Sequence, residues 1–211
     1  MHPLIAAIDD GAALVVNRYE RGDHSAWIVS SQGDVRARFL AGTAIQDILA
    51  SDRRLVITYS DESACCSSGI EGNGVAVFDT DGHYQFGYRE LFGSEAVDIW
   101  DCCCACWAED RRVLFLPYPE FPLVSFDLEN RTQEIWRTPR EVAGSEALTK
   151  IGQTVYFHGP YEDRSGVYRW SIGSCAADRI GDYPGRLRGL RGGRFLSVEA
   201  SGYTIVSPTE A

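Results

Sequence analysis

The alternation of apolar and polar positions is clearest between residues 95 and 139, where four short apolar runs follow one another. They cover Val97–Trp107, Val113–Leu116, Leu123–Phe126 and Gln133–Arg137. Turn-forming residues separate the runs: Glu109-Asp110-Arg111, Pro117 to Pro122, and Glu129-Asn130-Arg131. No apolar recurrence at three and four residues is sustained over a dozen positions, so the pattern disfavours helices. The stretch predicts four antiparallel strands in a meander.

The same pattern recurs along the whole chain. A second strand is predicted to open at Leu14, Leu55, Val113, Val155 and Phe195, a period of about 40 residues in the range of propeller blades. The step after Leu55 is longer because it holds a loop-like insertion at Asp61–Gly74. Third strands are predicted to end at Ser30, Phe78, Phe126, Trp170 and Val206.

Five repeats predict an all-β fold, a five-bladed β-propeller formed by one domain over residues 1–211. The alternative is an irregular β-sandwich, which such short strands also permit. The last repeat ends after its third strand. The ring therefore closes with help from N-terminal residues or leaves a short blade.

Several segments of the middle repeats resemble, in order, a set of largely uncharacterised bacterial proteins. The segments are YSDE (Tyr59–Glu62), GVAVFDTDG (Gly74–Gly82), DCCCACW (Asp101–Trp107), YPEFPLV (Tyr118–Val124) and HGPYED (His158–Asp163). The family pattern runs approximately YxDEGVFG, GLxxFDxxG, DCYALNV, YYTEFPLV and GGY. The resemblance covers about half the chain and implies a propeller-like fold without an established activity. This chain departs from the pattern after Glu62, and cysteines replace three residues of DCYALNV.

Charge and composition narrow the functional classes. The formal net charge of −10 argues against nucleic acid and anionic membranes as partners, because both attract clusters of cations. No apolar stretch is long enough to cross a bilayer, and MHPLIAAIDDG lacks the features of a secretory leader, so we expect a cytoplasmic protein. Six of the seven cysteines are bunched at 65–66 and 102–106, and the seventh is Cys175, a distribution that fits reduced, structural thiols better than disulfides or a metal site. No cofactor is predicted.

The loops of one propeller mouth hold the candidate binding residues. Loops joining second to third strands, and fourth to first strands, gather at the same end of a propeller, and acids outnumber bases there much more than in the opposite turns. Aromatic side chains lie between these acids and supply interface energy. The predicted partner-binding residues are Asp61, Glu62, Glu95, Tyr118, Glu120, Phe121, Glu146, Tyr161, Glu162 and Asp163.

Two functions remain in competition. The first is a non-catalytic binding protein whose acidic mouth holds a cationic, basic protein partner, in one version a bacterial immunity protein that masks a toxin's basic surface. The second is a carbohydrate-active hydrolase with carboxylates at the channel mouth, for which the candidates are Asp47, Asp98, Asp101, Glu62 and Glu120. The sequence favours the first, because no nucleophile motif or phosphate-binding loop is recognisable. The sequence leaves the oligomeric state open.

Overall fold

A computed structural model describes residues 3–8, 11–20, 22–51, 53–63, 69–109, 111–199 and 202–208. The chain divides into two compact units, Met1–Cys102 and Cys103–Ala211, and each is described by itself. None of the described helices is long and apolar enough to cross a membrane.

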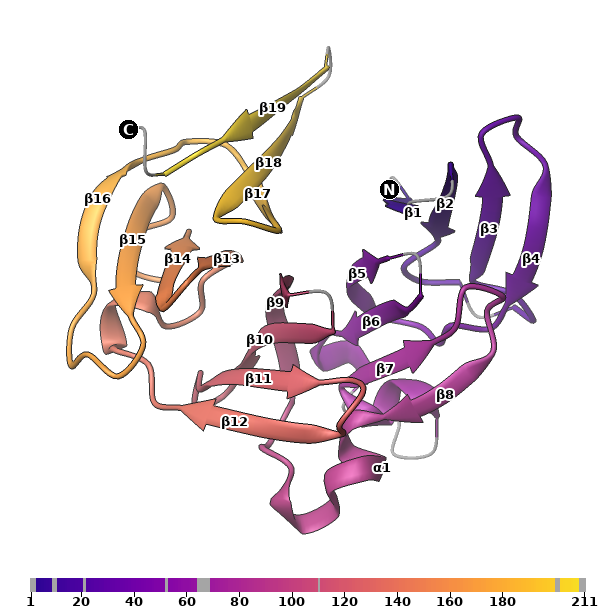
Figure 1. Ribbon diagram of the computed structural model, residues 1–211, viewed down its shortest axis with the longest axis horizontal. Coiled ribbons are helices and arrows are strands. Elements are labelled where there is room, and N and C mark those ends of the chain that lie inside the picture. The colour runs from indigo at the N-terminus through magenta and orange to yellow at the C-terminus, as the bar shows by residue number, and fades with distance from the viewer. Residues whose placement is uncertain are drawn as a thin grey trace. The chain divides into compact units, whose positions relative to one another are not determined.

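The first unit contains two four-stranded antiparallel sheets, each with its strands in chain order (Figure 1). The first sheet comprises β1 (Leu4–Ile8), β2 (Ala12–Val16), β3 (Ala26–Ser30) and β4 (Val35–Phe39). The second comprises β5 (Ile45–Ala50), β6 (Leu55–Tyr59), β7 (Val75–Phe78) and β8 (Tyr84–Gly87). The insertion between β6 and β7 includes two 3-10 turns, η1 (Asp61–Ser63) and η2 (Ile70–Asn73). Helix α1 (Tyr88–Phe92) and the turn η3 (Gly93–Glu95) follow β8.

The second unit contains three further meanders, the first of which begins two residues before the boundary. The third sheet comprises β9 (Asp101–Glu109), β10 (Arg112–Tyr118), β11 (Leu123–Asp127) and β12 (Thr132–Trp136). After the turn η4 (Arg140–Val142), the fourth comprises β13 (Ala147–Ile151), β14 (Thr154–His158), β15 (Gly166–Ser171) and β16 (Asp178–Asp182). The fifth comprises β17 (Leu187–Leu190), β18 (Arg194–Glu199) and β19 (Gly202–Val206).

Five successive antiparallel meanders define an all-β protein of the five-bladed β-propeller class, so the predicted fold is confirmed and the sandwich alternative is not supported. Each second strand begins within two residues of its predicted position. In the described part of the chain, the fifth sheet has three strands, and β1 pairs with β2 in the first sheet.

The cores follow directly from strand periodicity. Burial alternates along β2 and β3, where every second residue points into the first unit. The strands β6, β7 and β11 are buried at every position, as strands covered on both faces are. In the first unit the core includes Leu14, Ile57 and Phe78, and in the second it includes Leu116, Phe157 and Trp170. Each such side chain contributes about 1.5–3 kcal/mol on burial.

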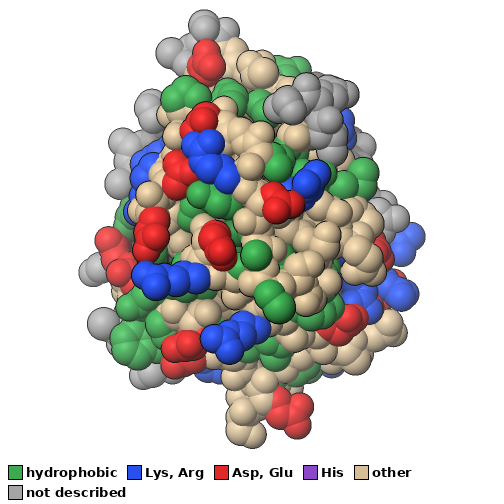
Figure 2. Space-filling view, turned by 90° about the vertical axis from the view of Figure 1, so that its left-hand side faces the viewer, with side chains coloured by type: hydrophobic (Ala, Val, Ile, Leu, Met, Phe, Trp, Pro, Cys, Tyr) green, Lys and Arg blue, Asp and Glu red, His purple; other side chains and the backbone are tan. Residues whose placement is uncertain are grey.

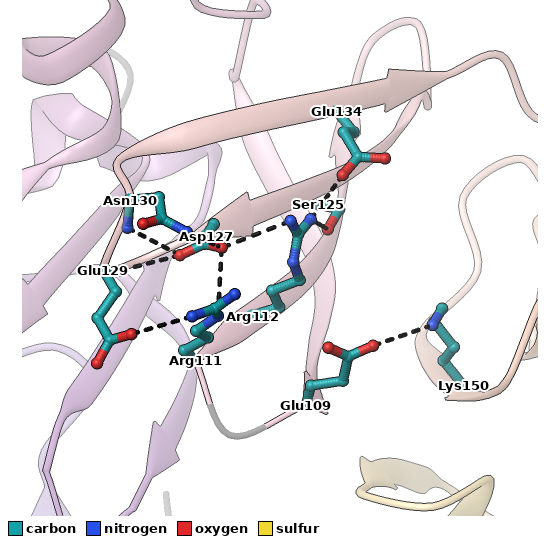
Figure 3. Close-up of polar contacts among 9 residues, drawn as sticks. All are labelled: Glu109, Arg111, Arg112, Ser125, Asp127, Glu129, Asn130, Glu134 and Lys150. Atoms are coloured by element: carbon teal, nitrogen blue, oxygen red, sulfur yellow. Dashed lines mark hydrogen bonds and ion pairs between the residues drawn. The ribbon is translucent and has the colours of Figure 1, made fainter.

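A buried carboxylate organises the turn between β11 and β12 (Figure 3). The Asp127 side chain is 0% exposed, and its Oδ1 accepts the backbone N–H groups of Glu129 and Asn130. Arg111 and Arg112 lie 3.4 and 3.5 Å from its Oδ2. Burial alone would raise the pKa of Asp127, but the hydrogen bonds from Asn130 and Glu129 and the charge of Arg111 lower it. Asp79 in the second blade and Ser30 in the first accept turn N–H groups at the equivalent position.

Two local predictions were wrong. Strand β9 begins at Asp101, four residues later than predicted, and Trp100 just before it is 54% exposed. Val97 instead donates its N–H to the hydroxyl of the buried Tyr88. The segment therefore bonds to a residue of α1 and does not join a sheet. Helix α1 itself was not predicted, since its five residues are too few to show a helical period.

Candidate functional site

The predicted partner-binding residues fall into both units. Asp61 and Glu62 lie in η1 and Glu95 ends η3, all exposed and in the first unit. The other seven belong to the second unit: they lie at the last residue of β10, on the loop between β10 and β11, at the residue before β13, and on the loop between β14 and β15. The structure brings several of these seven into contact.

An aromatic cluster forms where the β10–β11 and β14–β15 loops meet. The ring of Phe121 lies edge-on to Tyr118, with centroids 5.6 Å apart, and edge-on to Tyr161, with centroids 5.5 Å apart. Phe121 packs on the core of the second unit, whereas Tyr118 and Tyr161 are 36% and 48% exposed. The cluster of Tyr118, Phe121 and Tyr161 is thus anchored below and open to solvent above.

Tyr161 is held in place from two sides. A Cβ atom on Gly144 would lie 2.5 Å from the ring, so only a glycine allows the ring to rest on the backbone there. The guanidinium carbon of Arg164 lies 5.1 Å from the ring centroid on a cation–π contact. The backbone N–H of Tyr161 donates to the carbonyl of Ala143 at 3.0 Å. An aromatic side chain fixed in this way loses little conformational freedom on binding.

Phe121 is fixed by its own loop. Its φ of +51° is uncommon for a residue with a side chain, and the loop compensates with two hydrogen bonds. The backbone N–H donates to Pro117 at 3.0 Å, and the carbonyl accepts from the Thr138 hydroxyl at 2.6 Å. The aromatic cluster is therefore a rigid feature of the surface.

Three of the predicted acids around the cluster are paired with arginines. Glu146 lies 2.9 Å from Arg164, and Glu162 lies 3.3 Å from Arg140. Asp163 accepts from Arg179 at 2.8 Å and from the Tyr168 hydroxyl at 3.1 Å, and the Arg179 hydrogen bond is the main reason that the pKa of Asp163 is lowered. On the face that Figure 2 shows, acidic and basic side chains are interspersed. The charge close to the aromatic cluster is more balanced than the sequence suggested.

In the first unit, Asp61 influences a second carboxylate, that of Asp101. The Asp101 Oδ1 atom is buried and has no hydrogen-bond partner among the described residues. Burial, and then the charge of Asp61, raise the pKa of Asp101 from 3.8 to about 6. The Oδ1 atom of Asp101 therefore accepts no hydrogen bond from a backbone amide of the described residues, although buried acids inside a blade commonly do so.

The remaining candidate acids of a hydrolase have local roles. Asp47 accepts the backbone N–H of Ile48 at 2.8 Å within β5. Asp98 precedes β9 and accepts from the Trp100 indole at 3.0 Å, so the expectation that it lies on a first strand was wrong. Glu120 is exposed on the β10–β11 loop of the second unit.

The cysteines of β9 contribute to the core. Cys102, Cys104 and Cys106 are buried, and the last two pack in the cluster that holds Leu114 and Trp170. Cys65 and Cys66 lie outside the described residues. Among the described residues, the group with metal-compatible spacing is Asp79, Asp81 and His83. Oδ1 of Asp79 accepts the backbone N–H groups of Asp81 and His83, and its Oδ2 accepts from the Gln85 side chain and lies beside the His83 ring. This group therefore closes a turn.

The sequence reasoning missed two contributors to these surfaces. Arg164, which stacks on Tyr161 and pairs with Glu146, was counted only as a charge. The segment between β4 and β5, with Leu40 and Gly42, lines a cavity together with Glu62. From the sequence, this segment was assigned to no site. The one signal in the sequence was the glycine at position 42, because glycine readily adopts a positive φ such as the +87° found there.

Comparison with solved structures places the protein in the β-propeller class. A crystal structure described as that of RRP9 WD40 repeats is similar to this chain, with a TM-score of 0.60 and 12% sequence identity over 92% of the chain. WD40 repeats are propeller blades, and at this identity the likeness shows the fold alone. The match covers 58% of that chain's length. No protein-family model and no curated protein matches the chain.

Proposed function

We propose that this chain is a non-catalytic binding protein whose loops hold a cationic protein partner. The observation that carries the proposal is the rigid, partly exposed aromatic cluster of Tyr118, Phe121 and Tyr161. Tyrosines held against a packed base are the residues that most often dominate binding energy, because they bury area at low entropic cost. The propeller fold agrees with this use, since its loops present a broad surface on a rigid scaffold.

The net charge of the whole chain indicates the sign of the partner's charge. A net charge of −10 attracts basic proteins and repels anionic ones over the Debye length. A bacterial immunity protein that acts in the cytoplasm, and masks the basic substrate-binding surface of a toxin, is the concrete version of this proposal. The resemblance to bacterial propeller-like proteins supports that setting.

The test is to capture partners with the wild-type protein and then measure association and dissociation rates of the captured partner. Tyr161→Ala should speed dissociation at least tenfold, since a lost anchor costs roughly 2 kcal/mol. Tyr203→Ala is the matched control, because Tyr203 is 73% exposed on β19 of the same unit. Reversal of Asp61, Glu62, Glu120 and Glu162 to Lys should slow association and weaken its salt dependence. Unchanged rates in both variants would refute the proposal.

A second candidate function, a carbohydrate-active hydrolase, is supported by one observation. Asp101 and Asp61 are neighbouring carboxylates of which one has a raised pKa, the arrangement in which one acid donates a proton while the other stays charged. Turnover of a glycan that Asp101→Asn abolishes, while Tyr161→Ala leaves it unchanged, would favour this function over binding.

A further inference from the structure

A cavity of about 720 Å³ opens in the first unit, at the end where three connecting segments meet. They are the loop between β2 and β3, the link between β4 and β5, and the insertion between β6 and β7. The volume lies in the range of cavities that hold small molecules or single side chains of a partner. All of its described lining comes from one unit, so its geometry belongs to a single folded body.

The described lining combines acidic and apolar groups. Four carboxylates contribute, those of Glu20, Asp23, Glu62 and Glu71, and Tyr19, Leu40 and Ile70 supply apolar surface. No Lys or Arg is among the lining residues that the structure describes, and Arg21 of the β2–β3 loop is not a described residue. Arg18, at the start of the same loop, is directed elsewhere: its guanidinium donates to the carbonyls of Ile45 and Gln46 at 2.9 and 2.6 Å.

Glu71 lines the cavity beside two glycines, Gly42 and Gly69. A Cβ atom on Gly42 would lie 2.8 Å from a Glu71 carboxylate oxygen, and one on Gly69 would lie 2.6 Å away, so two glycines make room for this carboxylate. Below it lies Tyr59, 1% exposed, whose hydroxyl donates to the Ala41 carbonyl at 2.6 Å. Burial, and then the charge of Glu71, raise the pKa of Tyr59. A charge beside a buried aromatic side chain is screened less than one in open solvent.

Glu20 is already oriented by its own loop. Its carboxylate accepts from the Asn17 side chain at 3.3 Å and from the Gly22 backbone at 3.1 Å. For Asp23, Glu62 and Glu71, the described residues provide no salt bridge. The described lining of the cavity thus carries an excess of negative charge beside apolar groups.

We propose that this cavity takes the Lys or Arg side chain of the protein partner, an assignment that rests on the proposed function. The aliphatic stem would lie against Leu40 and Ile70, and the cationic head would lie among the carboxylates, Glu71 included. Tyr19, 42% exposed at the rim, offers an aromatic face to the same cation. A neutral side chain of equal length would leave the carboxylates without a partner, so the cavity discriminates by charge.

The cavity is tested with small probes, independently of any captured partner. N-acetyl-arginine amide and N-acetyl-lysine amide are titrated against the whole protein by NMR, with N-acetyl-norleucine amide as the neutral probe of similar shape. We expect the cationic probes to bind and the neutral one not to bind. Glu71→Gln together with Asp23→Asn should weaken the cationic probes at least tenfold, and added salt should weaken them in the wild type. Glu141→Gln, an exposed acid of η4 in the second unit, is the matched control.

The same pair of substitutions is then measured against the captured partner, with unchanged thermal unfolding as the check on folding. Loss of both probe and partner binding supports the assignment. Equal binding of the neutral probe, or cationic probes unaffected by the two substitutions, would overturn it. Weakened probes with unchanged partner affinity would also overturn it, while leaving the proposed function intact. Partner binding that depends on Glu71 but not on Tyr161 would support the cavity and refute the role of the aromatic cluster.

Discussion

Gly189 in β17 and Leu148 in β13 lie so close that a Cβ atom at position 189 would be 1.9 Å from the Leu148 carbonyl oxygen. That atom would also be 3.0 Å from the Cβ of Cys106 in β9. The backbones of β13 and β17 therefore approach closely at this level, and the side chain of Cys106 in β9 packs against the same point. Only a glycine permits such an approach.

Gly189→Ala should consequently destabilise the protein, by about 1–3 kcal/mol, because neither neighbour is a flexible side-chain end that can move aside. Urea denaturation followed by tryptophan fluorescence measures the change. Gly181→Ala in β16 is the control, since a Cβ atom there would meet no atom within 4 Å. Equal stability of the two variants would show that the first strands are less closely packed than described.

Most of the fold was predictable because short strands alternate with turn residues that recur in phase. Each blade presents its second strand as an apolar run after a polar turn, and Asp79, Asp127 and Ser30 mark equivalent hairpins. Helix α1 and the late start of β9 were not predictable, since Tyr88 and Val97 pair through a contact between segments nine residues apart. Nothing in the local pattern indicates such a contact.

The site was predictable in composition and not in arrangement. Counting strands placed acids and aromatic residues at one end of the blades, and the rings of Tyr118, Phe121 and Tyr161 are in contact. Which acids keep a free charge depends on arginines distant in sequence, as with Glu146 and Arg164. The sequence likewise could not indicate that the β4–β5 link would complete a cavity with Glu62 and Glu71.

The buried carboxylate of Asp127 should matter more to stability than its equivalent in the second blade. Asp127→Ala removes the acceptor of two turn N–H groups and one of the two carboxylate partners of Arg111 and of Arg112, at a side chain that is 0% exposed, and we expect a loss of about 3 kcal/mol. Asp79→Ala removes the same turn contacts where the side chain is 29% exposed, and should cost about 1 kcal/mol. Thermal unfolding of both variants gives the comparison.

The direction of the pKa shift at Asp127 adds a pH signature. Because its pKa is lower in the folded than in the unfolded chain, its contribution is present above pH 4 and is lost as the pH falls through the folded value. The difference in unfolding free energy between wild type and Asp127→Ala should therefore shrink in acid. A constant difference from pH 7 to the acid limit of folding would contradict this account.

The thiols provide a prediction about accessibility. In the native protein, Cys175 is exposed and should react with iodoacetamide within minutes, whereas the buried Cys102, Cys104 and Cys106 should react only as the protein unfolds. After denaturation without reductant, mass spectrometry should show adducts on all seven cysteines. A mass that lacks adducts on two cysteines would reveal a disulfide and contradict the expectation of reduced thiols.

Asp101 offers the sharpest test of electrostatics in the first unit. Its pKa is raised in the folded state to about 6, so folding binds a proton between about pH 4 and pH 6, and this stabilisation is lost as the pH rises through 6. Asp101→Asn cannot ionise and should be more stable than the wild type at pH 7.5, by about 1 kcal/mol after allowance for partial exposure of the side chain. At pH 4 the two should unfold at the same denaturant concentration.

Asp61→Asn separates the two causes of that shift. Burial is the larger cause and the charge of Asp61 the smaller, so removing the charge should recover only part of the gain at pH 7.5. Denaturation curves of the two single variants and the double variant, at pH 4 and pH 7.5, form a complete cycle. If Asp101→Asn lowers stability at pH 7.5, the buried oxygen has a partner that stabilises its charged form, and Asp101 is a structural anion like Asp127.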